Sequence, residues 1–349
     1  MSEKCHIRAA TEADEKNIQF LWSEIFKIPF PAQRYNWLYK VSNLKPITYL
    51  AIENYTDQAV GVSALHVSEY LCLGKTCKVA IAADFGVMPK YRVFGPAKAL
   101  QRNIINSVET HEVDFILAYP NKKAMKLMES VGYSSVSKTT MCVKYIDGTD
   151  IIGKFVKPRY VAAIFAKVYN SLVILPDAIF RAIFGKWTIQ TIDNVEELIK
   201  ANVQLPSNPS PAKMEKVKDF RYLIWRYELN TAIKHPITLV IRSVNGDIRG
   251  LAVISISNNK LTVLDIIGVI RKTDYLALIN KITIYARSKN IVLIEVIFTG
   301  GTVFRNMLML NGFILKQYER ELLIYPLSYK DTFAQYMKKS PIFESDMDF

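Results

Sequence analysis

Residues 84–100 read DFGVMPKYRVFGPAKAL and join a β-rich run to a helix. The run at 78–87 favours a strand, whereas the apolar residues beyond Ala97 return at helical spacing: Leu100, Ile104, Ile105 and Val108. The first N–H groups of a helix have no partners within it, and the helix dipole is positive there. This strand, loop and helix therefore predict a binding loop for an anionic group.

Three residues of the loop suit a pyrophosphate. Gly95 lets the backbone approach the phosphates closely, the small Ala97 lets the helix begin beside them, and Arg92 adds positive charge. Pro96 removes one N–H donor from the loop, which weakens it.

A regular order of elements surrounds this loop. Thr11 to Asp14 resembles a capping box that opens a helix. The other expected elements are a helix at 33–41, strands at 48–53, 61–73 and 78–87 with a turn at Gly74-Lys75, a strand at 115–118, a helix at 121–131 and a strand at 139–145.

The second half of the chain repeats this plan. The recurring pairs are Trp37 and Trp225, Pro46-Ile47-Thr48 and Pro236-Ile237-Thr238, Gly61 and Gly250, and Gly132-Tyr133 and Gly312-Phe313. Their offsets are nearly constant, so we expect two copies of one α/β unit, the second about nine residues shorter before its central helix.

The first copy resembles the GNAT superfamily of acyl-CoA-dependent N-acyltransferases. Its motif V-x-P-x-[YF]-[RQ]-x-x-G-x-[GA]-x-x-L is matched by Val87, Pro89, Tyr91, Arg92, Gly95, Ala97 and Leu100. The next motif, N-x-x-A-x-x-[LI]-Y-x-x-x-G-[FY], is matched by Asn121, Ala124, Leu127, Gly132 and Tyr133. The two motifs stand in the right order and cover roughly residues 6–146.

The resemblance implies a sheet splayed between two central strands, with acetyl-CoA or another acyl-CoA in the gap. The implied cofactor-binding residues are Val87, Arg92, Val93, Gly95, Ala97 and Asn121. A base must deprotonate the amine, and Asp84 at the strand end is the candidate. Met128 stands where many relatives carry the tyrosine that protonates the thiolate. Tyr133, Tyr119 and Tyr91 are candidate replacements, and we expect Tyr133 to be the catalytic one.

The expected fold is α/β (α+β), with two tandem GNAT-like domains that each contain a mixed, mostly antiparallel sheet flanked by helices. The expected division is 1–149 with the acyl-CoA loop, 150–185 as a helical connecting segment, 186–327 as a degenerate second copy, and 328–349 as a loosely held tail. The second copy carries Asp265 to Asp274 where the loop should be and lacks the Arg-x-x-Gly-x-Ala pattern.

The connecting segment is both apolar and basic. Residues 151–190 carry a net charge of +5 and include the greasy stretch 160–187, which charges and Pro176 interrupt, so no membrane span is expected. Two interpretations remain open: helices packed between the domains, or a basic amphipathic element at 151–187 that lies on an anionic membrane.

Composition narrows the class of protein. The 349 residues include 45 Lys and Arg against 32 Asp and Glu, a net charge of +13 that suits anionic partners. Four cysteines without a CxxC pair favour a reducing compartment, and the four histidines show no metal-ligand spacing, so no metal is expected. The charged start carries no secretory signal, so we expect a cytoplasmic protein, alternatively peripheral at the inner face of the membrane.

Three functions remain. The first is an enzyme, an N-acyltransferase, most simply an N-acetyltransferase, acting on a small-molecule amine, an amino sugar or an envelope precursor, with the acceptor between the two copies. The second is a Fem-like transferase that takes aminoacyl groups from tRNA. The third is a non-catalytic GNAT-fold binding protein.

Overall fold

The structure is a computed structural model, and it describes residues 4–28, 30–42, 45–72, 74–149, 152–153, 156–200, 214–230, 233, 235–269, 271–326, 333–335, 341–343 and 346. The first-half elements are β1 (Cys5–Ala9), α1 (Glu15–Leu21), α2 (Pro31–Tyr35), β2 (Ile47–Glu53), β3 (Ala59–Cys72), β4 (Lys75–Val87), α3 (Pro96–Asn106), β5 (Phe115–Ala118), α4 (Lys122–Glu129) and β6 (Ser134–Tyr145). The later elements are α6 (Arg159–Phe184), β7 (Thr188–Ile192), α7 (Val195–Lys200), β8 (Met214–Lys216), α8 (Phe220–Leu223), β9 (Ile237–Arg242), β10 (Ile248–Ser257), β11 (Lys260–Ile267), α9 (Lys272–Ser288), β12 (Leu293–Gly300), α10 (Thr302–Leu310), β13 (Ile314–Lys316), β14 (Glu321–Tyr325) and β15 (Pro341–Phe343).

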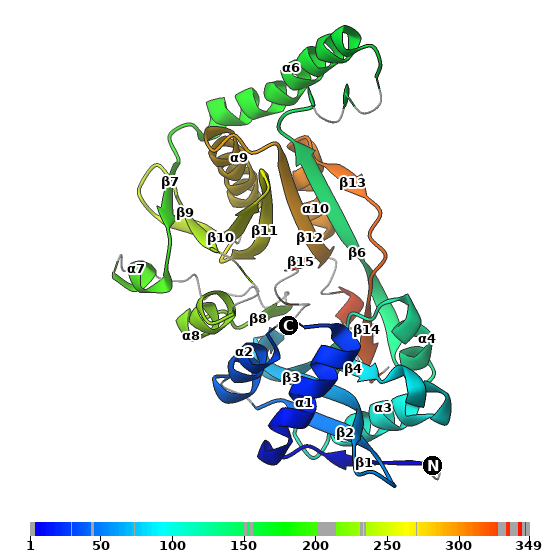
Figure 1. The fold of residues 1–349 in the computed structure, drawn as a ribbon. Helices are drawn as coiled ribbons and strands as arrows, with labels where there is room; N and C mark the ends of the chain where they lie inside the picture. Colours follow the sequence, from blue (N-terminus) through cyan, green and yellow to red (C-terminus); the bar gives the residue numbers. More distant parts are fainter. Residues whose placement is uncertain are drawn as a thin grey trace.

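One mixed sheet with helices on its faces runs through the molecule, so the fold is α+β (Figure 1). The strand order is β1-β2-β3-β4-β5-β14-β6-β12-β11-β10-β9-β7, with β8, β13 and β15 paired beside β3, β6 and β12. Antiparallel pairs dominate, whereas β4 with β5 and β11 with β12 are parallel.

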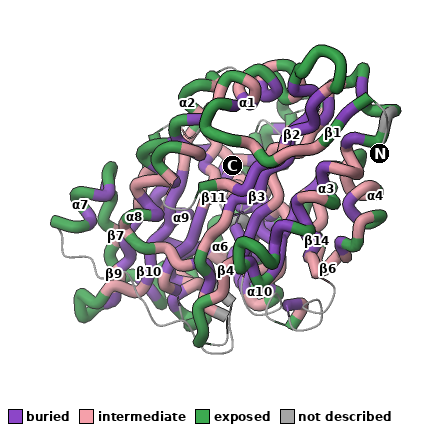
Figure 2. Tube along the Cα trace, turned by 90° about the horizontal axis from the view of Figure 1, so that it is seen from below, coloured by how far each residue is buried: buried purple, intermediate pink, exposed green. Residues whose placement is uncertain are grey.

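Helices cover both faces of the first half of the sheet. Leu50 and Ile52 of β2 face the α1 side, where they pack with Ile18 and Trp22 in one apolar cluster. Ala51 belongs to a cluster on the α3 side, together with Val87 of β4 and Leu100 of α3. The alternation along β2 thus divides the core into two layers, which is the two-residue period expected of a strand. Buried residues line both layers (Figure 2).

The predicted helix start at Thr11 is confirmed. The capping box is formed by Thr11 and Asp14, and in it the Asp14 carboxylate accepts from the Thr11 N–H at 2.8 Å. Arg8 also donates to this carboxylate, at 2.7 Å. A 3-10 turn (Glu12–Asp14) leads into α1, which continues as a π-helical turn (Trp22–Phe26). A second π-helical turn, Asn36–Lys40, follows α2. The first expected helix is therefore built from three segments and the second from two.

Trp37 and Trp225, one of the predicted repeat pairs, meet in space. Their rings stack at 5.3 Å, and each indole N–H donates to the backbone carbonyl of the other residue, at 2.7 and 3.1 Å. Both lie in π-helical turns, the second being Ile224–Glu228. The two residues that the sequence analysis paired are therefore in direct contact, with one indole bond in each direction.

Two strands cross between the halves of the sheet. β14, near the end of the chain, lies between β5 and β6, with Leu323 opposite both Ala118 and Ser135. β6 is longer than the expected strand at 139–145, and its C-terminal part lies between β12 and β13 in the other half. Each half is therefore completed by a strand from the other part of the chain.

The connecting segment forms α6, a helix that lies on the outside of the second half beside α9 (Figure 1). The interpretation as helices packed between two domains is wrong, because most large apolar side chains of α6 are exposed. Among the described residues α6 is the one helix long and apolar enough to cross a membrane.

The expectation of a loosely held tail is also wrong for its described residues. β15 pairs with β12, and Phe333, Ile342 and Asp346 are at most 6% exposed. Apolar side chains and a buried charge hold this part of the tail, and β15 lies near the centre of the molecule (Figure 1).

Candidate functional site

A pocket opens where the two parallel strands of the first half separate. β4 and β5 are paired from Val79 opposite Phe115 to Ala82 opposite Ala118, and beyond these residues they diverge. The pocket is about 340 Å³. It is lined by Phe26, Ile28, Arg34, Ala82, Ala83, Asp84, Phe85, Tyr119, Pro120, Asn121, Ala124, Met128 and Arg320.

An irregularity in β4 lies at this pocket. The register of β3 and β4 shifts between Val62 and Ala64, and Asp84 adopts a φ of +51°. A left-handed backbone is uncommon for a non-glycine residue and is often found at functional sites. The bulge places the Asp84 side chain in the pocket wall, where it is 4% exposed.

Asp84, the predicted base, is held by two side chains. Arg34 of α2 donates to its carboxylate at 2.8 Å, and the imidazole of His66 on β3 lies 3.5 Å from the other oxygen. Burial alone would raise the pKa of Asp84, but the Arg34 charge and the His66 contact outweigh it and lower that pKa. Asp84 is thus a carboxylate that keeps its charge and is only weakly basic.

His66 connects this pair to a neighbouring pocket. Burial lowers the pKa of His66 more than Asp84 raises it, so the imidazole is neutral at pH 7. The rings of His66 and Tyr39 pack edge to face with their centroids 6.3 Å apart, and the Tyr39 hydroxyl forms a hydrogen bond with Thr48 Oγ1 at 2.9 Å.

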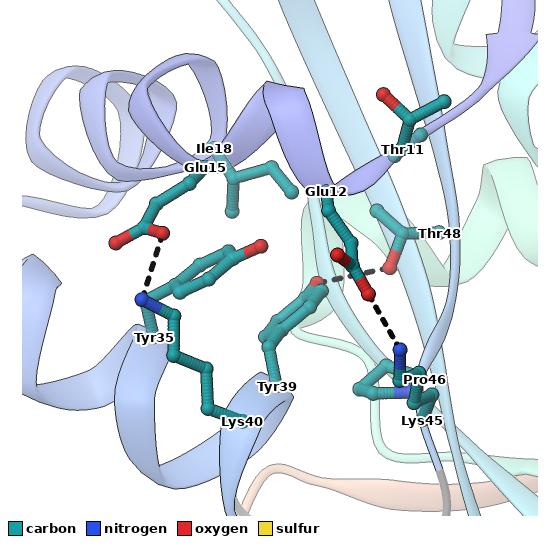
Figure 3. Close-up of a pocket in the computed structure, with 11 residues that line it drawn as sticks. Thr11, Glu12, Glu15, Ile18, Tyr35, Tyr39, Lys40, Lys45, Pro46 and Thr48 are labelled. Atoms are coloured by element: carbon teal, nitrogen blue, oxygen red, sulfur yellow. Dashed lines mark hydrogen bonds and ion pairs between the residues drawn. The ribbon is translucent and has the colours of Figure 1, made fainter.

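Tyr39 and Thr48 line a second pocket of about 620 Å³ beneath α1 (Figure 3). Two ion pairs stand at its rim, Lys40 with Glu15 at 2.9 Å and Lys45 with Glu12 at 2.6 Å. Tyr39 thus lines this pocket and also contacts His66, the partner of Asp84.

The predicted anion loop has the conformation that its glycine allows. Gly95 adopts φ +80°, and a Cβ built there would meet no heavy atom within 4 Å. The loop is a 3-10 turn (Pro89–Phe94), and α3 begins at Pro96. The N–H groups of Ala97 and Lys98 have no acceptor within the helix. The open space beside them therefore suits a phosphate.

Three other predicted residues frame the loop. Arg92 is exposed, and its Nε donates to the Val87 carbonyl at 3.0 Å, which leaves its terminal nitrogens outside this bond. Val87 is buried against Leu100, whereas Val93 is 84% exposed. Val93 thus presents an apolar surface to solvent beside the loop.

The remaining predicted residues are divided between the pocket and the core. Asn121 lines the pocket and caps α4, its side chain accepting from the N–H groups of Lys123 and Ala124 at 3.0 Å. Tyr133 lies in the apolar core, where its ring packs against that of Tyr325 with the centroids 5.6 Å apart. Burial raises the pKa of Tyr133, and the residue is outside the pocket lining.

Tyr119 occupies the pocket wall that Tyr133 does not reach. Burial and the nearby charge of Asp346 raise the pKa of its phenol well above the usual value, so the hydroxyl stays protonated. Tyr119 follows β5 directly, which brings the phenol beside the end of β4.

A buried charge cluster lies behind Tyr119 between the two halves. Lys218 donates to Asp265 and Asp346 at 2.7 Å each, and Tyr222 donates to Asp346 at 3.2 Å. Lys216 lies 3.8 Å from Asp346, and burial lowers its pKa to about 8. Asp265, near the end of β11, is fully buried and forms its ion pair with Lys218.

Sequence reasoning missed Arg34, His66 and Arg320. Arg34 lies in a helix and Arg320 in a loop, both without a recognisable motif, and His66 is one of the four histidines that show no metal-ligand spacing. Their proximity to Asp84 or Asn121 comes from strand pairing and helix packing alone. Among the described residues no group of three or more His, Cys, Asp and Glu could hold a metal ion.

The comparison with protein families identifies the first half. Residues 6–136 match the family model described as acetyltransferase (GNAT) domain. This match contains the splayed strands, the anion loop and the Asp84 bulge. Residues 6–136 therefore form a GNAT acetyltransferase domain. No curated protein matches the chain.

Solved structures resemble the chain over most of its length. A protein from Enterococcus faecalis V583 described as a probable N-acyltransferase matches with a TM-score of 0.65 and 13% identity, over 92% of this chain and 71% of that one. GCN5-related N-acetyltransferases from Anabaena variabilis (TM-score 0.59, 12% identity, 92% and 72% covered) and Kribbella flavida (TM-score 0.57, 10% identity, 92% and 70% covered) are also similar. At these identities the likeness concerns the fold.

Proposed function

We propose that the protein is an acyl-CoA-dependent N-acyltransferase that acylates a small-molecule amine, most simply by N-acetyl transfer. The observation that carries this proposal is the pocket at the split between β4 and β5, with Asp84 in its wall and an open anion loop beyond it. GNAT enzymes use acyl-CoA, and residues 6–136 are a GNAT domain.

The residues at hand fit this co-substrate. The N–H groups of Ala97 and Lys98 and the guanidinium of Arg92 would hold the pyrophosphate, because charge and free donors meet there. Acyl-CoA supplies the acyl group as a thioester. The backbone of residues 83–86, which β5 no longer pairs, would orient the thioester carbonyl.

Asp84 is our candidate proton acceptor, because it is the only carboxylate among the described residues that line the pocket. It would take the amine proton, directly or through water, while the new N–C bond forms and the C–S bond breaks. Tyr119 would give its proton to the departing thiolate. Arg34 keeps Asp84 ionised and in place, and the same interaction makes the Asp84 carboxylate a weaker base.

We further propose that the chain contains two GNAT-like halves of which only the first binds acyl-CoA. Apart from β8, the order of strands and helices is similar in each half. This similarity and the reciprocal bonds of Trp37 and Trp225 support the division. In the second half the buried ion pair of Asp265 with Lys218 would occupy the equivalent strand end. The acceptor would then enter between the halves, beside Tyr119 and Arg320.

Melting with and without acetyl-CoA tests the donor site. Ligand at about 100 times its dissociation constant should stabilise the wild type by about 2.7 kcal/mol. Gly95→Glu should abolish this shift, because it places a carboxylate where the phosphates bind. Gly246→Glu is the matched control, since Gly246 also has a left-handed φ of +84° and open space around it.

If the wild type is not stabilised by acetyl-CoA, or if Gly95→Glu responds like Gly246→Glu, the proposed donor site is refuted. If acetyl-CoA binds, release of free thiol in the presence of candidate amines identifies the acceptor. Binding without thiol release for any amine would favour a non-catalytic role.

A further inference from the structure

α6 exposes a broad apolar face to solvent. Its exposed side chains are Tyr160 (69%), Ile164 (61%), Phe165 (56%), Val168 (53%), Ile174 (49%), Leu175 (60%), Ile179 (55%) and Ile183 (61%). Ile164, Val168, Leu175, Ile179 and Ile183 recur at intervals of four or seven residues, so they share one side of the helix. An apolar patch of this extent on a soluble protein marks an interaction surface.

The charges exposed along this segment all have one sign. Lys157, Arg159, Lys167, Arg181 and Lys186 are exposed, and the one acidic residue in 156–187, Asp177, is buried. At helical spacing Lys167 and Arg181 fall beside the apolar face, while Lys157 and Lys186 flank its two ends. This arrangement is typical of helices that lie in the interface of an anionic membrane.

The opposite side of α6 is fixed to the second half of the protein. Asp177 forms a buried ion pair with Lys144 of β6, and Arg287 of α9 donates to it at 2.7 Å. Asn170 bonds to Asp147 and Gly148 at the end of β6. A helix held in this way can press its free side onto a surface, whereas crossing a bilayer would expose the buried ions to lipid.

We propose that α6 docks the protein on an anionic lipid bilayer, with the helix axis parallel to the membrane plane. Its apolar side chains enter the boundary between headgroups and acyl chains, and the five basic residues contact lipid phosphates. A second copy of the chain is disfavoured as occupant, because symmetric pairing of this face would bring the basic residues of both copies together.

This docking is independent of the acyltransferase proposal. The GNAT domain lies at the opposite end of the molecule from α6 (Figure 1). The pocket at β4 and β5 would therefore remain on the aqueous side, away from the lipid surface.

Vesicle flotation of the full chain tests the proposal. Vesicles of phosphatidylcholine alone are compared with vesicles in which one third of the lipid is phosphatidylglycerol. We expect binding to the anionic vesicles only, and release at about 1 M NaCl, where charges are screened within about 3 Å. Each basic residue near an anionic surface strengthens binding about fivefold.

Two variants separate the two contributions. Neutralising Lys157, Lys167 and Arg181 to Gln should weaken binding about 100-fold, whereas the same change at exposed Lys16, Lys75 and Lys138 removes equal charge and should weaken it far less. Leu175→Glu with Ile179→Glu should abolish binding. The control pair Tyr55→Glu with Phe30→Glu changes residues of the first half that are 80% and 62% exposed, and it should leave binding intact.

Four results would overturn the proposal. Two concern the vesicles: no binding to anionic vesicles, or equal effects of the variants and their controls. The other two are resistance to alkaline carbonate extraction, as for a spanning helix, and a dimer in solution that the Leu175→Glu and Ile179→Glu changes dissociate. Acetyl-CoA melting of the same variants should match the wild type, so failure here is distinguishable from failure of the donor site.

Discussion

Replacing Arg34 by Met tests the ion pair that holds Asp84. The carboxylate is 4% exposed and would lose the cation that lies 2.8 Å away. Removing one partner of a buried pair costs about 3–5 kcal/mol. At about 2.1 cal/mol/K per residue the unfolding entropy of the 349-residue chain is about 0.7 kcal/mol/K. A loss of about 4 kcal/mol therefore lowers Tm by about 5 °C.

Asp84→Asn should lower the free energy of unfolding less than Arg34→Met does. Asn tolerates the left-handed backbone at this position, and Arg34, with its side chain 15% exposed, can turn toward water in the pocket. The double variant should be more stable than the sum of the two single losses predicts, because it removes both charges.

The pH dependence has a defined sign. The pKa of Asp84 is lowered in the folded protein, so the pair contributes stability above the unfolded pKa of about 3.9 and loses it as pH falls through the folded value. Without Arg34, burial should raise the pKa of Asp84. Lowering the pH should then protonate the carboxylate and remove the free-energy cost of burying an unpaired charge. The Tm difference between wild type and Arg34→Met should be larger at pH 7 than at pH 4.

Melting curves at both pH values for the three variants provide the measurement. A Tm within about 1 °C of the wild type for Arg34→Met, against the worked shift of about 5 °C, would show that the pair is not buried as described. Strict additivity in the double variant would refute the direct interaction.

Three further variants test other contacts. Trp225→Phe removes the N–H that bonds to the Trp37 carbonyl, and it should lower stability by about 1–2 kcal/mol in urea unfolding. His66→Gln should flatten the loss of Tm between pH 6.5 and 5, because the lowered pKa of His66 makes the folded state resist protonation, and an unchanged slope would contradict this. Asp177→Asn leaves the buried Lys144 without its carboxylate, so the protein should unfold at a clearly lower urea concentration. If adding Lys144→Met restores part of the lost stability, the ion pair is supported.

The local elements of the first half could be predicted because each has a short-range signal. Thr11 and Asp14 are three residues apart, and the strand at 115–118 was predicted with the bounds of β5. Gly95 was predicted to let phosphates approach the backbone, and the space around it is open in the structure; its φ of +80° is a further reason for a glycine there. Periodicity and turn chemistry act within a few residues, so a single sequence records them.

The site could be predicted only in part because its contacts are long-range. Asp84 was selected from its place at a strand end, but its partner Arg34 is 50 residues away and depends on how α2 packs against the sheet. Tyr133 was chosen from a motif, and the pocket wall holds Tyr119 in its place. The exposure of α6 was also hidden, because an apolar sequence does not reveal which of its faces the rest of the chain covers.

The place of β14 in the sheet has a consequence for how the protein is made. During translation β5 and β6 leave the ribosome long before residues 321–325, which must come to lie between them. Until then the GNAT domain carries two strand edges without their final partner, and such edges invite pairing with other nascent chains. A gene fragment that ends at the connecting helix should therefore yield aggregated protein, and co-expression of the missing fragment should rescue its solubility.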